Sequence, residues 1–406
     1  MEPGSKMKKP RIALYSHDTM GLGHIRRNLL ISRALVEAPL DADILLIAGM
    51  REAGAFPMPQ GVDCLTLPAY RKESSGSYRA RSLQLEPTTF RTLRSEIITA
   101  ALRRFEPDIL IVDNVPRGVQ GELTPILEEL RAGGRTLCVL GLRDVLDDAE
   151  SVRRQWWRHR NYEALRDLFD QVWVYGDPRL YDTGREYGFE SAIAEKLVYT
   201  GYLDQTMRFE AKNPLQRLPA DKPYILCAVG GGQDGVKVTE AFARAALPSG
   251  FAGVILTGPF MPEESRRLLL DLVSRRDDMN VLQFVAEPIQ LIRDAARVVT
   301  MGGYNTVMEI LSFEKQALVI PRVKPRQEQI VRAERLAARR FIDVLRPEAA
   351  SVEALSAWMS KPAASVRSAR ASLDFGGLRR IPGLAAELIT RPRRQASFAA
   401  SAVAAE

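Results

Sequence analysis

Three glycine-rich turns carry the residue types that could bind an anion. They span residues 20–24, 230–235 and 302–306, and each follows a short apolar run. Glycine lets the backbone turn tightly and approach a ligand, and the N-terminus of the following helix offers free N–H groups to an anion. A single turn of this kind is more often a plain connection than a phosphate site. Three of them in one chain favour a ligand bound between two α/β halves.

The second turn fits a dinucleotide fingerprint only in part. Gly230, Gly232 and Gly235 satisfy G-x-G-x-x-G, but the next expected strand ends in Leu256-Thr257-Gly258 without the acidic residue that would bind a ribose. In the first turn, Arg26 occupies the third glycine position, and no lysine of the Walker type follows any of the turns. These departures argue against a nicotinamide dehydrogenase and against a P-loop enzyme.

The elements that must position these turns are visible as short apolar runs that alternate with amphipathic stretches of helical length, such as 25–37 and 306–312. Continuous apolar strands alternating with helices predict parallel sheets that are covered on both faces, which is the α/β class. The expected strands lie at 12–15, 44–47, 109–112, 136–140, 172–175, 224–229, 254–256, 281–285, 298–300 and 317–320.

A break in this alternation predicts two domains. Residues 206–223 contain three prolines among charged residues and lack apolar periodicity, as a linker does. We expect an amino-terminal Rossmann-like domain over 1–205 and a carboxyl-terminal one over 224–375. A helix is expected over 376–390, and the alanine- and serine-rich tail over 391–406 is expected to be disordered.

Composition and charge exclude several classes of protein. The 57 Lys and Arg residues outnumber 50 Asp and Glu residues, so the net charge is +7, which favours anionic partners without requiring nucleic acid. Three isolated cysteines and three histidines argue against a disulfide scaffold and a zinc site. No apolar run approaches the roughly 20 residues of a membrane-spanning helix. We therefore expect a cytoplasmic protein without a secretory leader, in solution or peripheral on the inner face of the membrane.

The third turn and the chain after it resemble a known family. Met301 to Leu311 reads MGGYNTVMEIL, and the ALVIPR and RQEQ segments follow at 317–322 and 326–329. This pattern resembles the donor-binding half of GT-B glycosyltransferases of family 28, which includes the peptidoglycan N-acetylglucosamine transferase. Ser16 to His24 is similar to the opening of bacterial proteins classed as glycosyltransferases of this type. The resemblance implies two Rossmann-like domains that face a central cleft.

The resemblance implies which residues hold a nucleotide-sugar donor. Glu309 occupies the place of the glutamate that binds the ribose hydroxyls, and it shares a helix face with Asn305, four residues earlier. Phe284 and Val285 match the segment whose backbone pairs with the base; a core role for Phe284 stays an alternative. Glu328 and Gln329 fall where family members contact the sugar, although an amide is commoner at the first position. The expected diphosphate contacts are Gly302, Gly303, Tyr304, Asn305 and Thr306, with Gly231, Gly232 and Gln233.

On the acceptor side, the resemblance implies that His24 assists deprotonation of the acceptor. An ordinary imidazole titrates near pH 6.5, which suits a general base. The alternative is that His24 only caps its helix. Asp113 ends an apolar run, so it faces the same cleft if the sheet is parallel, as a competing base or as the group that orients His24. The remaining expected acceptor-side residues are Gly21, Gly23, Arg143 and Asp144, where Arg-Asp replaces the His-Glu of the peptidoglycan enzyme.

The expected function is metal-independent transfer of a hexosyl or N-acetylhexosaminyl group from a nucleotide-sugar co-substrate, with a uridine nucleotide favoured, to an acceptor hydroxyl. No other cofactor is expected. Two alternatives remain: an isomerase similar to the UDP-N-acetylglucosamine 2-epimerases, and a catalytically silent nucleotide-sugar-binding protein. The basic stretch from Arg71 to Arg104 and the Trp156-Trp157 pair suit either a solvated face or contact with a lipid-linked or anionic acceptor or an anionic membrane surface.

Overall fold

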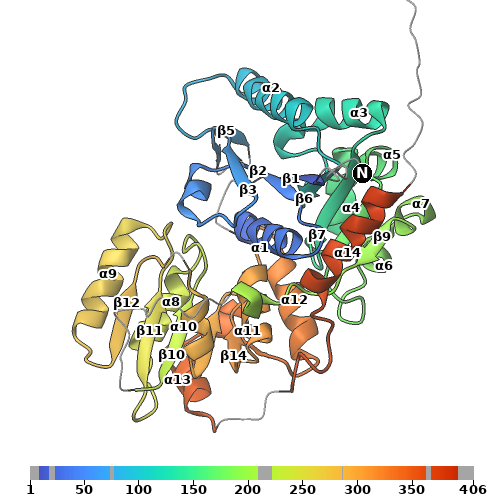
Figure 1. Ribbon diagram of the computed structural model, residues 1–406. Coiled ribbons are helices and arrows are strands. Elements are labelled where there is room, and N and C mark those ends of the chain that lie inside the picture. Colours follow the sequence, from blue (N-terminus) through green and yellow to red (C-terminus); the bar gives the residue numbers. More distant parts are fainter. Residues whose placement is uncertain are drawn as a thin grey trace, which may run out of the picture.

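The chain forms two α/β halves, each built on one parallel sheet (Figure 1). The computed structural model describes residues 9–17, 23–73, 77–208, 222–285, 287–362 and 367–391. Within these residues, the first sheet lies in the amino half and the second in the carboxyl half, as the alternation of apolar runs and helices predicts.

The amino-half sheet has seven strands in the order β3-β2-β1-β6-β7-β8-β9. Its central strands are mainly apolar because helices cover both faces; every residue of β6 is buried, for example. The strands are β1 (Arg11–Ser16), β2 (Asp43–Ala48), β3 (Val62–Thr66), β6 (Ile109–Asp113), β7 (Leu137–Arg143), β8 (Gln171–Tyr175) and β9 (Leu197–Tyr199), and β4 (Tyr70–Lys72) with β5 (Tyr78–Ala80) forms a separate antiparallel pair. The helices are α1 (Gly23–Glu37), α2 (Pro87–Phe105), α3 (Thr124–Gly133), α4 (Ala149–Arg158), α5 (Asn161–Leu168), α6 (Thr183–Tyr187) and α7 (Ser191–Ala194).

The carboxyl-half sheet has six strands in the order β12-β11-β10-β13-β14-β15. The strand that we expected over 281–285 ends earlier, at Leu282, so Phe284 and Val285 lie in the loop that follows it. The strands are β10 (Tyr224–Ala228), β11 (Ala252–Leu256), β12 (Met279–Leu282), β13 (Arg297–Thr300), β14 (Ala317–Val319) and β15 (Asp343–Val344). The helices are α8 (Val236–Arg244), α9 (Glu263–Ser274), α10 (Ile289–Asp294), α11 (Tyr304–Ser312), α12 (Glu328–Ala337), α13 (Val352–Ser360) and α14 (Gly377–Thr390).

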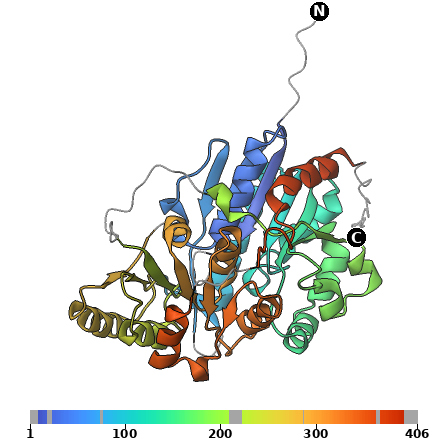
Figure 2. The same cartoon turned by 90° about the horizontal axis from the view of Figure 1, so that it is seen from below.

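The chain crosses between the halves twice. The first crossing follows β9 through a short 3-10 turn, η3 (Gln205–Arg208); most of the expected linker, 209–221, lies outside the described residues. The second crossing brings the last described helix back, so that α14 lies beside α1 of the amino half (Figures 1 and 2). The tail expected over 391–406 lies outside the described residues except for Arg391.

Buried side chains hold the two halves together. Tyr304 of α11 donates a hydrogen bond to the carbonyl oxygen of Tyr175 at 2.8 Å, across the interface. Arg332 of α12 pairs with Asp144 of the amino half at 3.0 Å, and the hydroxyl of Tyr202 donates to the same carboxylate at 2.9 Å. All five side chains are buried, and one apolar cluster continues from the first sheet into the second. The interface is therefore packed as a core.

Candidate functional site

The two sheets present their topological switch points to each other. In the amino half, β1 lies between β2 and β6, so the order of the sheet reverses where β1 meets β6; in the carboxyl half it reverses where β10 meets β13. Ligands of open parallel sheets bind outside the carboxyl ends of the strands at such points. His24 comes after β1, and Asp113 is the last residue of β6; the glycine turns at 230–232 and 302–303 follow β10 and β13.

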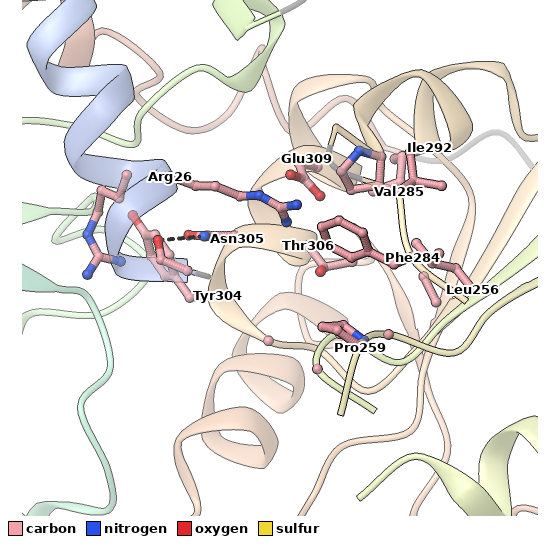
Figure 3. A pocket seen from close by; sticks show the side chains of 18 of the residues that line it. Arg26, Leu256, Pro259, Phe284, Val285, Ile292, Tyr304, Asn305, Thr306 and Glu309 are labelled. Carbon is pink, nitrogen blue, oxygen red and sulfur yellow. Dashed lines mark hydrogen bonds between the residues drawn. The ribbon is translucent and has the colours of Figure 1, made fainter. Parts of the chain in front are cut away.

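A cavity of about 280 Å³, the central cavity, lies between these strand ends (Figure 3). Both halves line it, so a ligand bound there would contact both sheets at once. Its wall is formed by Gly23, His24, Arg26, Arg27 and Arg143 of the amino half and by Ala228, Gly230, Gly231, Leu256, Gly258, Pro259, Phe260, Phe284, Val285, Pro288, Ile292, Gly303, Tyr304, Asn305, Thr306 and Glu309 of the carboxyl half.

His24 is held by a buried carboxylate. Its Nδ1 lies 2.6 Å from Oδ2 of Asp113, and Nη2 of Arg27 lies 2.7 Å from both carboxylate oxygens. Nη2 of Arg27 is also 2.8 Å from Nδ1 of His24. A carboxylate can only accept and Arg27 already has both Asp113 oxygens as acceptors, so we assign the ring proton to Nδ1. Nε2 of His24 then keeps its lone pair.

Asp113 is anionic in this arrangement. Burial by itself would raise the pKa of its carboxyl, but Arg27 and His24 outweigh burial and hold the pKa below its usual value. Asp113 therefore lies where it can orient His24, which is one of the two roles that the sequence left open for it, and Arg27 balances its charge. Arg27 was not predicted as a site residue, because the motif that contains His24 ends at that histidine. The two residues lie three positions apart on α1, within reach of one another.

A second histidine, His17, stands beside the first. The two rings are tilted, with their centroids 4.3 Å apart. Burial, and next the neighbouring His24, lower the pKa of His17 well below its usual value, so His17 is neutral. His17 lines a separate cavity of about 650 Å³, the side cavity, which lies mainly in the amino half. The central and side cavities therefore meet at this histidine pair.

The glycines of the second turn are required by close backbone contact. Gly232 has a φ of 95°, and a Cβ at this residue would lie 2.2 Å from the carbonyl oxygen of Thr257. Gly258 has a φ of 79°, and its Cβ would lie 2.1 Å from the carbonyl oxygen of Gly230. Gly231 and Gly230 line the central cavity, whereas Gln233 is exposed and is not on its wall. The expected contact with Gln233 is therefore not supported by this geometry.

The third turn leads into α11, whose N-terminus faces the central cavity. Gly302 has a φ of 80°, which glycine tolerates, and a Cβ on Gly303 would meet nothing within 4 Å. The amide of Asn305 donates to the carbonyl oxygen of Gly23 at 2.9 Å, so it joins the first and third glycine turns (Figure 3). Because the Tyr304 hydroxyl is engaged at the interface, Tyr304 offers only its backbone and ring to the cavity.

Glu309 lies one turn further along α11 and is 2% exposed. Its Oε1 accepts a hydrogen bond from Nη1 of Arg208 at 2.7 Å, and Nη2 of Arg208 also contacts the exposed Glu287. Arg26 of α1 points toward the same carboxylate (Figure 3). Burial raises the pKa of Glu309, while Arg208 and then Arg26 oppose that rise. The sequence analysis did not assign either arginine to this site, since both are distant from Glu309 in sequence.

The opposite end of the central cavity is apolar. This part of the wall is formed by the half-exposed Phe284 together with Val285, Leu256, Ile292 and Pro259 (Figure 3). A flat ring could stack on Phe284 and lie against these aliphatic side chains. The alternative that Phe284 is a core residue does not hold, because 50% of it is exposed.

The two residues expected at the sugar are engaged with the protein. Glu328 is buried and pairs with Arg143 at 2.8 Å, across the interface between the halves. Burial alone would raise the pKa of Glu328, but Arg143 and Arg332 hold it below its usual value. Oε1 of Gln329 accepts from the backbone N–H of Arg322 at 2.9 Å, which leaves its amide nitrogen available.

Two other expectations are corrected. Asp144 does not face an acceptor, because it is fully buried in the ion pair with Arg332 that joins the halves. Within the basic stretch, Arg94 is also fully buried, where its guanidinium binds both oxygens of Glu122 at 2.7 Å, so it cannot contact a membrane. Gly21 lies outside the described residues.

Neither a metal centre nor a membrane span is found in the part of the chain that the structure describes. Its histidine, cysteine and acidic residues form no group of three that could hold a metal ion. None of its helices is long and apolar enough to cross a bilayer.

Comparison with known proteins identifies the domain that carries the third turn. Residues 231–363 match the model of the glycosyltransferase family 28 C-terminal domain. The carboxyl half is therefore similar to the family 28 C-terminal domain. The match begins at Gly231 and includes α11 with Glu309, so the matched segment provides most of the wall that the carboxyl half gives to the central cavity.

Relatives extend the similarity into the amino half. An uncharacterized glycosyltransferase of Methanosarcina acetivorans is 22% identical over 322 residues, which cover 74% of this chain and 77% of that protein. One of Methanosarcina mazei is 27% identical over 163 residues, so the match spans only 39% of this chain and 40% of that protein.

Solved structures show that the whole chain has the GT-B fold. The crystal structure of LpCGTa in complex with UDP has a TM-score of 0.60 and covers 95% of this chain and 100% of its own. The two chains are 14% identical, so this likeness shows the fold and not the substrate. The two parallel-sheet halves that the sequence predicted are thus confirmed as a GT-B arrangement, and the carboxyl half is similar to the family 28 C-terminal domain.

Proposed function

We propose that the protein transfers a sugar from a nucleoside diphosphate sugar, with uridine as the favoured base, to an acceptor hydroxyl. One observation carries the proposal: the N-terminus of α11, the buried Glu309 and the His24–Asp113 pair all surround one cavity between two switch points. The family 28 domain and the glycosyltransferase relatives support sugar transfer. The UDP that is bound to one protein of the same fold supports the choice of nucleotide.

The donor is oriented by the electrostatics of α11. Its diphosphate accepts hydrogen bonds from the backbone N–H groups at the start of the helix, where the helix dipole is positive. The ribose then reaches Glu309, one turn further in, and the base lies on Phe284. Helix N–H groups stabilise the charge that grows on the diphosphate as the bond to the sugar breaks, a role that a metal ion has in other enzymes.

The transfer step uses His24. As the acceptor oxygen forms its bond to the anomeric carbon, Nε2 of His24 takes the hydroxyl proton. The bond between the anomeric carbon and the diphosphate oxygen breaks, and the diphosphate leaves with the electron pair. Asp113 stabilises the imidazolium that results, because its carboxylate accepts from Nδ1 at 2.6 Å. The sugar is a hexose or N-acetylhexosamine, close to Gln329, whose amide nitrogen is available to a sugar hydroxyl.

The two alternatives make different demands on the cavity. A 2-epimerase of this fold relies on several carboxylates and histidines in its cleft. Among the residues that the structure describes, His24 and Glu309 are the only histidine and the only acidic residue on the wall of the central cavity. A silent binding protein has no need of a histidine oriented by a buried carboxylate.

The fate of a labelled donor tests the proposal. The purified protein is incubated with UDP-sugars that carry a label in the sugar, with and without a mixture of hydroxyl acceptors. We expect label in a new product and release of an equal amount of UDP. An epimerised donor would establish the isomerase instead. Unchanged donor that is nevertheless bound would establish the silent binding protein.

A further inference from the structure

The side cavity lies beside the histidine pair, and its wall carries several polar side chains among apolar ones. Its wall includes the loop after β6, where Asn114, Gly118, Gln120 and Gly121 all have positive φ values between 54° and 78°. Leu146 and Asp147 of the β7–α4 connection and residues of the helix α4 also line it. Arg326, which belongs to the carboxyl half, completes the cavity.

Two guanidinium groups on this wall have no carboxylate partner. Arg117 comes from the loop after β6, and Arg326 precedes α12; neither forms an ion pair with any residue in the described ranges. Other arginines around the site are paired: Arg27 with Asp113, Arg143 with Glu328 and Arg332 with Asp144. Among the described residues that line the side cavity, Asp147 is the acidic one, and its Oδ1 accepts from the backbone N–H groups of Asp148 and Gln327.

Three buried polar atoms at this wall also have no hydrogen-bond partner among the described residues. They are Nδ1 of His17, Oδ1 of Asn114 and Nε of Arg117. A buried polar atom without a hydrogen bond costs about 1–3 kcal/mol, so such atoms are normally satisfied by a ligand or by water. Their clustering next to His17, where the side cavity meets the central cavity, indicates a ligand that has both hydrogen-bond donors and acceptors.

We propose that the side cavity binds a phosphorylated acceptor, with the phosphate held between Arg117 and Arg326. This inference rests on the proposed function, in which the acceptor hydroxyl must reach His24. A tetrahedral phosphate presents oxygens in several directions, so it can bind two guanidinium groups that come from different halves. The polyol or sugar that carries the phosphate places its hydroxyl at the histidine pair. The phosphate belongs either to a free metabolite or to a lipid headgroup.

The position of Arg326 links acceptor binding to closure of the two halves. The neighbouring N–H of Gln327 donates to Asp147 of the amino half at 2.7 Å, and the next residue, Glu328, pairs with Arg143. These contacts hold Arg326 against the side cavity. The phosphate site is therefore complete only while the carboxyl half is docked on the amino half, which is also the state in which the central cavity is formed.

Binding of small phosphates in the presence of UDP tests this inference. Saturating UDP fills the diphosphate site. Calorimetry at constant ionic strength then measures the binding of inorganic phosphate, of glycerol 3-phosphate and of glycerol. We expect both phosphates to bind and glycerol not to bind. Arg117→Gln and Arg326→Gln should each weaken phosphate binding by roughly 10–150-fold, which is the range for a charge-assisted hydrogen bond. Arg154→Gln is the matched control, since Arg154 is exposed on α4 and pairs with Glu150.

Each outcome decides between the possibilities. Unchanged UDP affinity in the two variants shows that they are folded. If both variants bind phosphate as the unaltered protein does, or if no phosphate binds, the inference is wrong while the donor site stands. There is one exception when no small phosphate binds. If the protein binds phosphatidylcholine vesicles that contain phosphatidic acid, and both variants lose this binding, the phosphate belongs to a lipid headgroup. If UDP itself does not bind, the proposed function fails, and this inference fails with it.

Discussion

Replacing Glu309 by alanine should weaken nucleotide binding in a way that depends on the ribose. The carboxylate lies on the wall of the central cavity, one helical turn beyond the N–H groups that would hold the diphosphate. Hydrogen bonds that a carboxylate accepts from hydroxyls contribute about 1.5–3 kcal/mol, so the Glu309→Ala variant should bind UDP roughly 10–150-fold more weakly. Glu309→Gln should recover part of the loss, because its amide oxygen still accepts but carries no charge.

The ion pair with Arg208 adds a second effect, which the assay must separate. Removing one partner of a buried pair typically costs about 3–5 kcal/mol of folding free energy. Arg208 keeps its contacts with Glu287 and Gln205, so the loss here should be smaller. We therefore expect a lower melting temperature for Glu309→Ala, in addition to weaker binding.

Calorimetry with UDP and with its 2′,3′-dideoxy analogue isolates the ribose contact. Both nucleotides are measured with the same variant, so any effect of the substitution on the fold cancels in the ratio of the two affinities. We expect Glu309→Ala to weaken UDP binding and to leave binding of the dideoxy analogue nearly unchanged. Glu287→Ala is the control, because Glu287 also pairs with Arg208 but is exposed and is not on the cavity wall. Equal losses for the two nucleotides would refute the assigned contact.

Three further predictions concern catalysis and stability. His24→Ala should lower the turnover of labelled donor by about 10²–10⁴-fold with UDP affinity unchanged, and near-normal turnover would remove His24 from the proton transfer. Because the pKa of Asp113 is held below its usual value, its charge stabilises the fold fully above pH 4, and this contribution is lost as the pH falls through the lowered pKa. Denaturant titrations should accordingly show a smaller loss of unfolding free energy below about pH 4 in Asp113→Asn than in the unaltered protein; parallel profiles would contradict that. Activity should persist in chelator, since the N-terminus of α11 supplies the positive potential; loss that only a divalent cation restores would contradict a metal-independent transfer.

Much of the fold could be predicted because the central strands are buried on both faces. Such strands appear in the sequence as continuous apolar runs, for example Ile109 to Val112, and glycine turns mark their ends. Short edge strands were missed: β9 and β15 have only three and two residues, too few to show a pattern. The strand at 281–285 was set too long because Phe284 and Val285 are apolar, although they line a cavity and not the core.

The candidate site was less predictable wherever a side chain is paired over a long sequence distance. Glu309 meets Arg208, 101 residues earlier, and Arg332 meets Asp144, 188 residues away. Sequence alone does not show which charges are paired, so Asp144 was placed at the acceptor when it joins the halves. Arg94 was counted with a solvated basic face for the same reason, although its partner Glu122 is buried with it.

Hydrogen–deuterium exchange with and without saturating UDP tests the central claim most directly. That claim is that the nucleotide lies between the two halves, at the start of α11 and beside His24. The account predicts slower exchange in peptides that cover 301–309 and 228–232, together with 23–27 on the opposite side of the cavity. Unchanged exchange at 301–309, with UDP bound and protection confined to other segments, would contradict it.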